Sequence, residues 1–247
     1  MVEFREDMVI KLVQDIRRYQ PKLGGKKLYK LLRLDLNRLE GSIGRDKFFD
    51  ILRKRGLLVK RRKKYATTTD SWHRFHKYKN KLRDKRLTGP NQAYVSDITY
   101  LRTRKGFVYL FLQTDAYSRK ITGWDLSDSL AIDGAIRALK MTIRQCKIPK
   151  GVIHHSDRGI QYCCKEYVKI LKRNKMEISM TEENHCYENA MAERVNGILK
   201  EEFLLDETFA DEVSVLKAVK EAIQSYNTRR PHWSLNLCTP QQIHDAA

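Results

Sequence analysis

Three carboxylates of this 247-residue chain stand out by their positions, and one of them, Asp97, falls where an acid is costly unless a cation or a donor compensates it. Asp97 stands within a run of β-forming residues, Asp157 closes a second such run, and Glu193 lies in a helical pattern. Converging at one edge of a fold, they would need divalent metal, and two Mg²⁺ ions about 3.5–4 Å apart, with Mn²⁺ as a substitute, promote in-line phosphoryl displacement. The three acids are therefore the predicted catalytic residues and metal ligands, and the predicted chemistry is cleavage or transfer of nucleic-acid strands.

The elements that must position these acids are expected to form a mixed α/β layer fold. Alternating and short apolar runs predict five strands, at 93–101, 107–114, 121–126, 151–155 and 177–180. Helical periodicity predicts helices at 131–146, 165–174, 188–203 and 212–226. The first three strands, separated by tight turns, should form an antiparallel meander. Asp97 then lies in the first strand, Asp157 at the carboxyl end of the fourth, and Glu193 on a helix.

Charge is distributed unevenly along the chain. Residues 1–89 contain 27 Lys and Arg against 10 Asp and Glu, a net charge of +17 out of +19 for the whole chain. Clustered basic residues gain affinity for nucleic acid by releasing condensed counterions, so the first third is expected to bind a polyanion. A solubilising basic face or a membrane-surface patch is the alternative.

Apolar spacing and glycine turns predict three short helices at the start of the chain. They cover 9–16, 27–32 and 45–53, and Gly24-Gly25 and Gly41–Gly44 break the chain between them. A basic third helix fits a helix-turn-helix DNA reader, in which Arg45, Lys47 and Arg53 would reach bases or phosphates. A small three-helix protein-docking module is the alternative.

Four motifs point to a known family. They occupy residues 97–100 (DITY), 155–162 (HSDRGIQY), 187–190 (YENA) and 226–232 (YNTRRPH). Together they resemble the second-frame transposase of the insertion-sequence-3 family, whose core is similar to retroviral integrases. The resemblance implies a ribonuclease-H-like fold with an Asp, Asp, Glu triad, the last two members separated by 35 residues. Here 35 residues lie between Asp157 and Glu193.

Two further residues follow from the spacing along the helix that carries Glu193. Asn189 lies four residues before it and Lys200 seven residues after it, so all three share one helical face. A basic residue seven positions after the Glu is part of the family pattern, and the resemblance implies that Lys200 contacts DNA, with Asn189 beside it. A solvated surface lysine is the alternative.

Several residues near the triad need a separate interpretation. Asp115, before a turn, is more typical of a cap or a partner of Arg119 than of a metal ligand. His154 and His155, at a strand end, are more typically hydrogen-bonded than catalytic. Three acids compete with Glu193 as the third ligand, but none gives the family interval: Glu182, Glu183 and Glu188.

The predicted domains are a helix-turn-helix-like unit at 1–59, a basic linker at 60–89, an integrase-like core at 90–210 and a C-terminal helix and tail at 211–247. The predicted function is a DNA transposase that cleaves 3′ ends and transfers strands. We expect a homo-oligomer on DNA, fused to or bound by the upstream-frame protein, in the bacterial cytoplasm at the nucleoid and not in a membrane. A non-catalytic DNA-binding repressor and a simple nuclease are the alternatives. Five cysteines, an odd number, predict reduced thiols.

Overall fold

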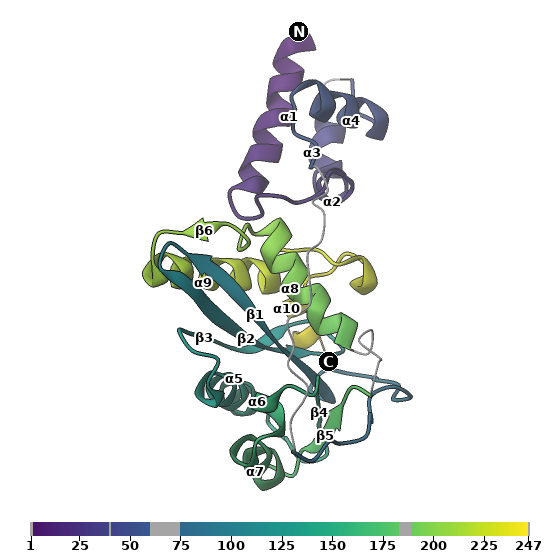
Figure 1. Ribbon diagram of the computed structural model, residues 1–247. Helices are drawn as coiled ribbons and strands as arrows, with labels where there is room; N and C mark the ends of the chain where they lie inside the picture. The colour runs from purple at the N-terminus through teal and green to yellow at the C-terminus, as the bar shows by residue number, and fades with distance from the viewer. Residues whose placement is uncertain (1, 40, 60–74, 183–188, 247) are drawn as a thin grey trace. The chain divides into compact units, whose positions relative to one another are not determined.

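The computed structural model describes residues 2–39, 41–59, 75–182 and 189–246, and the chain divides into two compact units (Figure 1). One unit holds residues 1–65 together with 201–204, and the other holds 66–200 and 205–247. No helix within the described ranges is both long and apolar enough to span a bilayer.

The first unit is all-helical, as expected, but it contains four helices where the sequence pattern predicts three. These are α1 (Val2–Arg17), α2 (Gly25–Leu31), α3 (Arg33–Arg38) and α4 (Arg45–Lys54). The additional helix is α3, which continues almost directly from α2 because only Leu32 separates them. Leu28, Leu32 and Leu36 follow one another at intervals of four residues and are all buried in the same core. The apolar face therefore continues past the predicted helix end.

A mixed sheet dominates the second unit. The expected meander is confirmed: β1 (Ala93–Thr103), β2 (Gly106–Asp115) and β3 (Ile121–Ser127) pair antiparallel. On the other side of β1, β4 (Ile153–Ser156) and β5 (Glu177–Met180) add in parallel, giving the order β3-β2-β1-β4-β5. The short β6 (Thr208–Phe209) pairs with the far end of β1, which is therefore the central strand.

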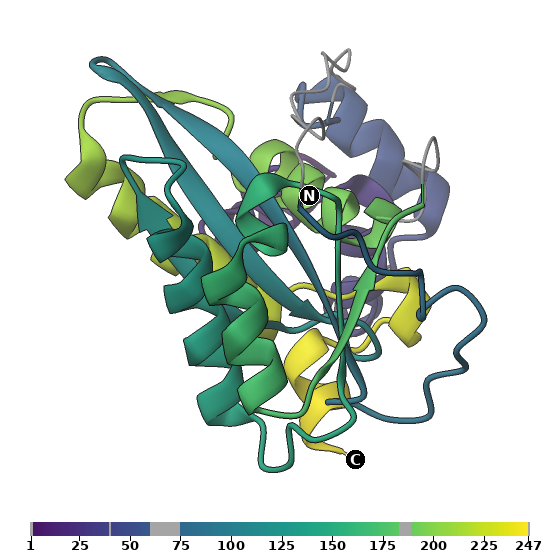
Figure 2. The same ribbon diagram turned by 60° about the horizontal axis from the view of Figure 1, so that its bottom comes forward.

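Helices pack against both faces of this sheet. On one face, α5 (Ile132–Gln145), α6 (Ile160–Cys163) and α7 (Lys165–Arg173) enclose the main core (Figure 2). A smaller core on β1 and β4 receives Ala192 of α8 (Ala190–Glu202). The chain then forms α9 (Glu212–Thr228), which contacts β1 and β3, a 3₁₀ turn at Trp233–Leu235 and α10 (Pro240–Asp245).

Most long elements agree with their predicted ranges to within a few residues, but α1 begins at Val2 rather than at Val9, and several short elements were missed. Besides α3, the missed elements are α6, β6, the 3₁₀ turn and α10. A helix of at most six residues completes fewer than two turns, so its apolar face does not repeat often enough to be recognised, and β6 has only two residues. The four described cysteines are free: Cys146, Cys163, Cys164 and Cys238. The fifth, Cys186, lies outside the described residues.

Candidate active site

The pairing of β1 with β4 brings the two aspartates together. The strands are parallel neighbours, and Ser96 of β1 pairs with Ser156 of β4. Asp97 follows Ser96 on β1, and Asp157 follows Ser156 directly after the end of β4. The backbones of the two aspartates therefore come side by side. The Asp157 carboxylate is held by its own turn, because its Oδ1 accepts a hydrogen bond of 3.0 Å from the Gly159 N–H.

Helix α8 places the third acid beside them. Glu193 lies in the first turn of α8, and its side chain is exposed. One turn further on, the buried Asn196 donates a hydrogen bond from Nδ2 to Oδ2 of Asp97, at 2.7 Å. This bond ties α8 to β1 across 99 residues of sequence and puts Glu193 on the helix face that approaches Asp97.

The charges of the three acids act on one another. The pKa of Asp97 is raised to about 7, first by burial and then by the negative charges of Asp157 and Glu193, while hydrogen bonds from the Ile98 backbone and Asn196 act in the opposite direction. The two neighbouring acids therefore disfavour the charged form of Asp97. Among the described residues, no three His, Cys, Asp or Glu side chains are already arranged as ligands of a single metal ion.

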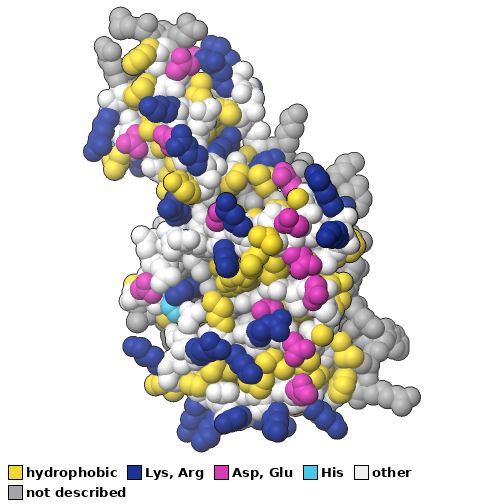
Figure 3. Space-filling model, turned by 90° about the vertical axis from the view of Figure 1, so that its left-hand side faces the viewer, with side chains coloured by type: hydrophobic (Ala, Val, Ile, Leu, Met, Phe, Trp, Pro, Cys, Tyr) yellow, Lys and Arg dark blue, Asp and Glu magenta, His cyan; other side chains and the backbone are white. Residues whose placement is uncertain are grey.

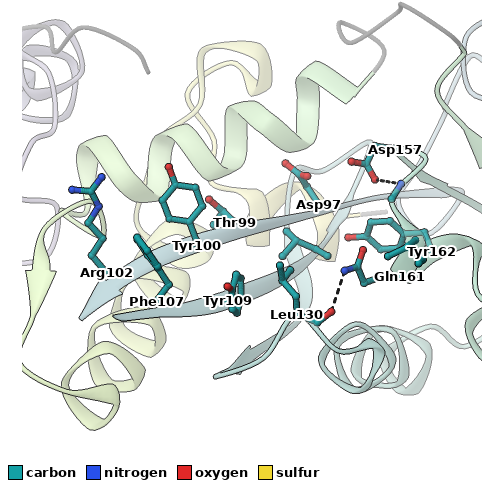
Figure 4. A pocket seen from close by; sticks show the side chains of 13 residues that line it. Asp97, Thr99, Tyr100, Arg102, Phe107, Tyr109, Leu130, Asp157, Gln161 and Tyr162 are labelled. Carbon is teal, nitrogen blue, oxygen red and sulfur yellow. Dashed lines mark hydrogen bonds between the residues drawn. The ribbon is translucent and has the colours of Figure 1, made fainter. Parts of the chain in front are cut away.

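A cavity of about 490 Å³ opens beside the two aspartates. Figure 4 shows the carboxylates of Asp97 and Asp157 near one end of it, with Tyr162 and Gln161, whose Nε2 donates to the Leu130 carbonyl at 3.0 Å. From there the cavity continues along β1 and β2 to residues of the hairpin that they form. Those lining residues are Tyr100, Arg102, Phe107 and Tyr109.

Lys200 lies over this hairpin. Its Nζ is 4.3 Å from the centroid of the Tyr100 ring, a cation–π distance. Burial lowers the pKa of Lys200, while the carboxylates of Asp206 and Asp97 act in the opposite direction. The side chain is therefore half-buried and near Asp97, unlike a fully solvated surface lysine. Its contact with DNA stays a prediction.

Asn189 occupies a different environment from the one expected of a DNA contact. It is buried, and its Nδ2 donates to the Ser96 carbonyl at 3.4 Å. Asn189 and Asn196, seven residues apart, both bond to β1, so the predicted common helical face is the one that docks on the sheet. The DNA contact predicted for Asn189 is not tested by this placement.

Asp115 is a turn residue, as expected. Its Oδ1 accepts hydrogen bonds from the backbone N–H groups of Tyr117 and Ser118 and from the Ser118 hydroxyl, and its Oδ2 accepts from the Asn91 N–H at 2.6 Å. The carboxylate is fully buried and both of its oxygens accept hydrogen bonds.

The two histidines after Ile153 are buried rather than presented to the cavity. The Nε2 atom of His154 is within hydrogen-bond distance of the hydroxyls of Ser96 and Tyr167, at 2.7 and 2.8 Å, and Gln113 bonds to both hydroxyls. Burial lowers the pKa of His154 to about 3, so the ring is neutral. His155 bonds to Ser179 through Nδ1 at 2.8 Å. Both are hydrogen-bonded, as predicted.

The predicted DNA-reading residues of the first unit are exposed on α4, and each lies beside an acid. Arg45 bonds to Asp46 at 3.1 Å, Arg53 pairs with Asp50, and Lys47 lies 3.8 Å from the buried Glu6. On the face shown in Figure 3, Lys and Arg side chains occur on both units. The DNA-reading function of α4 stays a prediction.

Sequence reasoning missed Asn196 and the hairpin aromatics. Asn196 follows Glu193 by three residues, and that spacing places it on the same face, which was the available signal. Tyr100 and Phe107 had no such signal, because their proximity depends on the register of β1 and β2. Glu183 and Glu188, two of the competing acids, lie outside the described residues, and Glu182 pairs with Arg83 at 3.5 Å.

Comparison with known proteins shows the class of protein to which the chain belongs. Two integrase core domain families match the second unit, one over residues 88–186 and the other over 174–240. The "Insertion element IS600 uncharacterized 31 kDa protein" of Shigella sonnei is 33% identical over 200 residues, which cover 80% of this chain and 74% of that protein. "Transposase InsF for insertion sequence IS3A" of Escherichia coli K12 is 36% identical over 194 residues, covering 78% and 67%. The chain belongs to the insertion-sequence-3 family of transposases.

Solved structures support the fold. The catalytic core domain of HTLV-2 integrase, solved in complex with magnesium, matches 64% of this chain and 99% of its own with a TM-score of 0.52 and 20% identity. The simian T-cell lymphotropic virus intasome, solved with the PP2A regulatory subunit B56 gamma, matches 90% of this chain and 74% of its own, with a TM-score of 0.56 and 17% identity. The second unit therefore has the expected integrase-like, ribonuclease-H-like core.

Proposed function

We propose that this transposase cleaves the 3′ ends of its insertion sequence and transfers them to target DNA, using Asp97, Asp157 and Glu193. The observation that carries the proposal is the convergence of the three acids: β1 and β4 pair up to Ser96 and Ser156, and Asn196 ties the helix that carries Glu193 to Asp97. The negative charges of Asp157 and Glu193 raise the pKa of Asp97, and a perturbed carboxyl group at the rim of a cavity is typical of a functional site.

Divalent metal fits this set of side chains. Carboxylate oxygens are the ligands that Mg²⁺ prefers, and Mn²⁺ accepts the same donors. Asp97, Asp157 and Glu193 would hold the ions, two in the proposed arrangement. When bound, the metal activates the attacking water or 3′-hydroxyl and neutralises charge on the phosphate and the leaving oxygen.

The chain's own residues prepare this site. Asn196 fixes one oxygen of Asp97, and the Gly159 N–H fixes one oxygen of Asp157, so each carboxylate keeps a defined orientation. Lys200, half-buried above Tyr100, supplies a positive charge next to the acids that can hold a DNA phosphate. The cavity gives the reacting strand a place beside the aspartates.

The partners in this proposal are the element ends and the target DNA. The first unit would bind element DNA through α4, and the active form would be a homo-oligomer that holds both ends, acting on DNA in the bacterial cytoplasm. An upstream-frame protein would join the complex, as a fusion or as a bound subunit.

A strand-transfer assay tests the proposal. Pre-cut duplexes carrying the terminal sequence of the element that encodes this chain are incubated with plasmid target and Mg²⁺, with and without the upstream-frame protein. We expect joining by the wild type and its loss in Asp97→Asn, Asp157→Asn and Glu193→Gln, with DNA binding retained. Glu182→Gln is the matched control and should retain joining.

Each alternative has its own result in this assay. Hydrolysis without joining would identify a nuclease. Binding without either reaction, under both conditions, would identify a non-catalytic DNA-binding protein. Near-wild-type joining by Glu193→Gln would refute the assignment of the third acid.

A further inference from the structure

The far half of the cavity has no role in the chemistry of the carboxylates. Tyr100 and Arg102 are two residues apart on β1 and pair with Tyr109 and Phe107 on β2, so the four side chains lie on one face of the hairpin. β1 and β2 extend beyond the end of α5, the helix that covers this face nearer the core (Figure 2). The aromatic side chains therefore line an open groove, which we call the hairpin groove.

The groove is apolar at its floor and basic at its borders. The Phe107 side chain is 50% exposed. Its ring packs edge to face with the Tyr100 ring, with 5.3 Å between the ring centroids and an interplanar angle of 86°. Lys200 covers the Tyr100 ring from α8, and the exposed Arg102 makes no ion pair with any part of the chain that the structure describes. Aromatic faces bordered by cations are the features that bind single-stranded nucleic acid, through base stacking and phosphate contacts.

The groove is continuous with the catalytic acids and has a matching length. Asp97 and Tyr100 line the same cavity, which ends at Arg102. Five residues of strand from Asp97 to Arg102 span about 17 Å. A single DNA strand advances about 3.4 Å per stacked nucleotide, so a few nucleotides fit along this distance. A purely apolar protein partner would form no charged contact with the two cations, Arg102 and Lys200.

We propose that the hairpin groove binds two or three unpaired nucleotides of the DNA strand whose reacting end lies at the carboxylates. A base stacks on Phe107, and Arg102 and Lys200 hold the phosphates on either side. The inference rests on the proposed function, because it assigns this site a DNA strand as its substrate. It adds that the strand leaves the duplex before it reaches the acids.

Binding of two matched DNA probes tests the proposal on the full chain. One probe is a blunt duplex and the other is the same duplex with four unpaired nucleotides at the 3′ end, both fluorescein-labelled and titrated in Ca²⁺ to prevent reaction. Stacking of one base contributes about 1–3 kcal/mol, so Phe107→Ala should weaken binding of the unpaired end at least fivefold and leave the blunt duplex within twofold. Phe107→Trp should restore binding, and Phe107→Leu, which stays apolar, should not.

Matched controls come from the same unit. Arg102→Gln should weaken the unpaired end, whereas Arg104→Gln, in the adjoining turn but outside the cavity, should not. Trp233→Ala removes an aromatic side chain of similar exposure, 53%, far from the groove in sequence, and should have no effect. Photo-cross-linking with 5-iodouracil in the unpaired end should label Phe107 or Tyr100.

The outcomes separate this inference from the proposed function. Equal loss for blunt and unpaired probes in Phe107→Ala, or cross-links only outside the groove, would overturn the groove proposal even if strand transfer is normal. Selective loss with the unpaired probe in an Asp157→Asn background would support the groove even if the wild type transfers no strands.

Discussion

At the residue scale, the raised pKa of Asp97 predicts an unusual dependence of stability on pH. The folded protein binds this proton more tightly than the unfolded chain does, because the pKa rises from 3.8 to about 7 on folding. In metal-free protein the free energy of unfolding should therefore fall as pH rises from about 4 to about 7, by up to about 4 kcal/mol from this group, and then level off.

Asp97→Asn removes the titrating group and keeps an oxygen for Asn196. The variant should be more stable than the wild type above pH 7 and should lose the advantage near pH 4. Thermal unfolding in EDTA at pH 4.5, 6 and 8 measures this, with the exposed Asp84→Asn as the control that should follow the wild type. Parallel curves for wild type and Asp97→Asn would show that Asp97 titrates normally.

A second prediction at this scale separates Asp115 from the catalytic acids. Asp115→Ala leaves the Tyr117, Ser118 and Asn91 N–H groups without their acceptor, and should lower the free energy of unfolding by about 2–4 kcal/mol. Asp115→Asn keeps an oxygen to accept the hydrogen bonds of the turn but places its amide NH₂ group against the Asn91 N–H. It should therefore lower the free energy of unfolding by less than Asp115→Ala does. Urea unfolding measures both effects. Strand transfer per folded molecule should stay within twofold of wild type, and its loss in folded Asp115→Asn would add Asp115 to the site.

At the element scale, two glycines predict opposite results for the same substitution. A Cβ at Gly123 of β3 would lie 2.2 Å from the Ala138 carbonyl oxygen of α5, whereas a Cβ at Gly197 of α8 would meet no atom within 4 Å. Gly123→Ala should therefore destabilise the protein by at least about 1–3 kcal/mol through overpacking. Gly197→Ala should stabilise it by about 0.5–1 kcal/mol, because alanine loses less backbone entropy in a helix. Chemical denaturation of both variants checks the pair, and a stable Gly123→Ala would contradict the close packing of α5 on β3.

The elements also show how far the sequence could predict the site. The strand and helix types that carry Asp97, Asp157 and Glu193 follow from apolar periodicity, which is a local property. The proximity of Asp97 and Asp157 does not, because it depends on which strands pair and in which register. The same applies to the bond from Asn196 and to the Tyr100–Phe107 contact. α3 was missed for a different reason: the apolar face continues through Leu32, and the helix is interrupted there without the glycine or proline that marks a helix end elsewhere.

At the scale of the whole molecule, the charge asymmetry predicts where salt-dependent binding resides. Each phosphate contact contributes about 0.9 to the slope of log affinity against log salt concentration. Replacing Arg45, Lys47 and Arg53 together by Gln should reduce the slope for duplex DNA by about two to three units if α4 contacts phosphates. The matched control replaces three exposed lysines of α7, Lys165, Lys169 and Lys172. Deleting residues 1–89 should remove most of the slope, and an unchanged slope would place DNA binding in the core.

The hydrogen bond between Asn196 and Asp97 can form only after α8 has been synthesised. A ribosome completes β1 long before it completes α8, since 99 residues separate the two partners. Until α8 emerges, the nascent chain carries Asp97 and Asp157 without Glu193 or the amide that orients Asp97. Contacts so distant in sequence form late in folding. Under the proposed function, a fragment left by a premature stop codon before α8 would lack the third acid and could not transfer DNA strands.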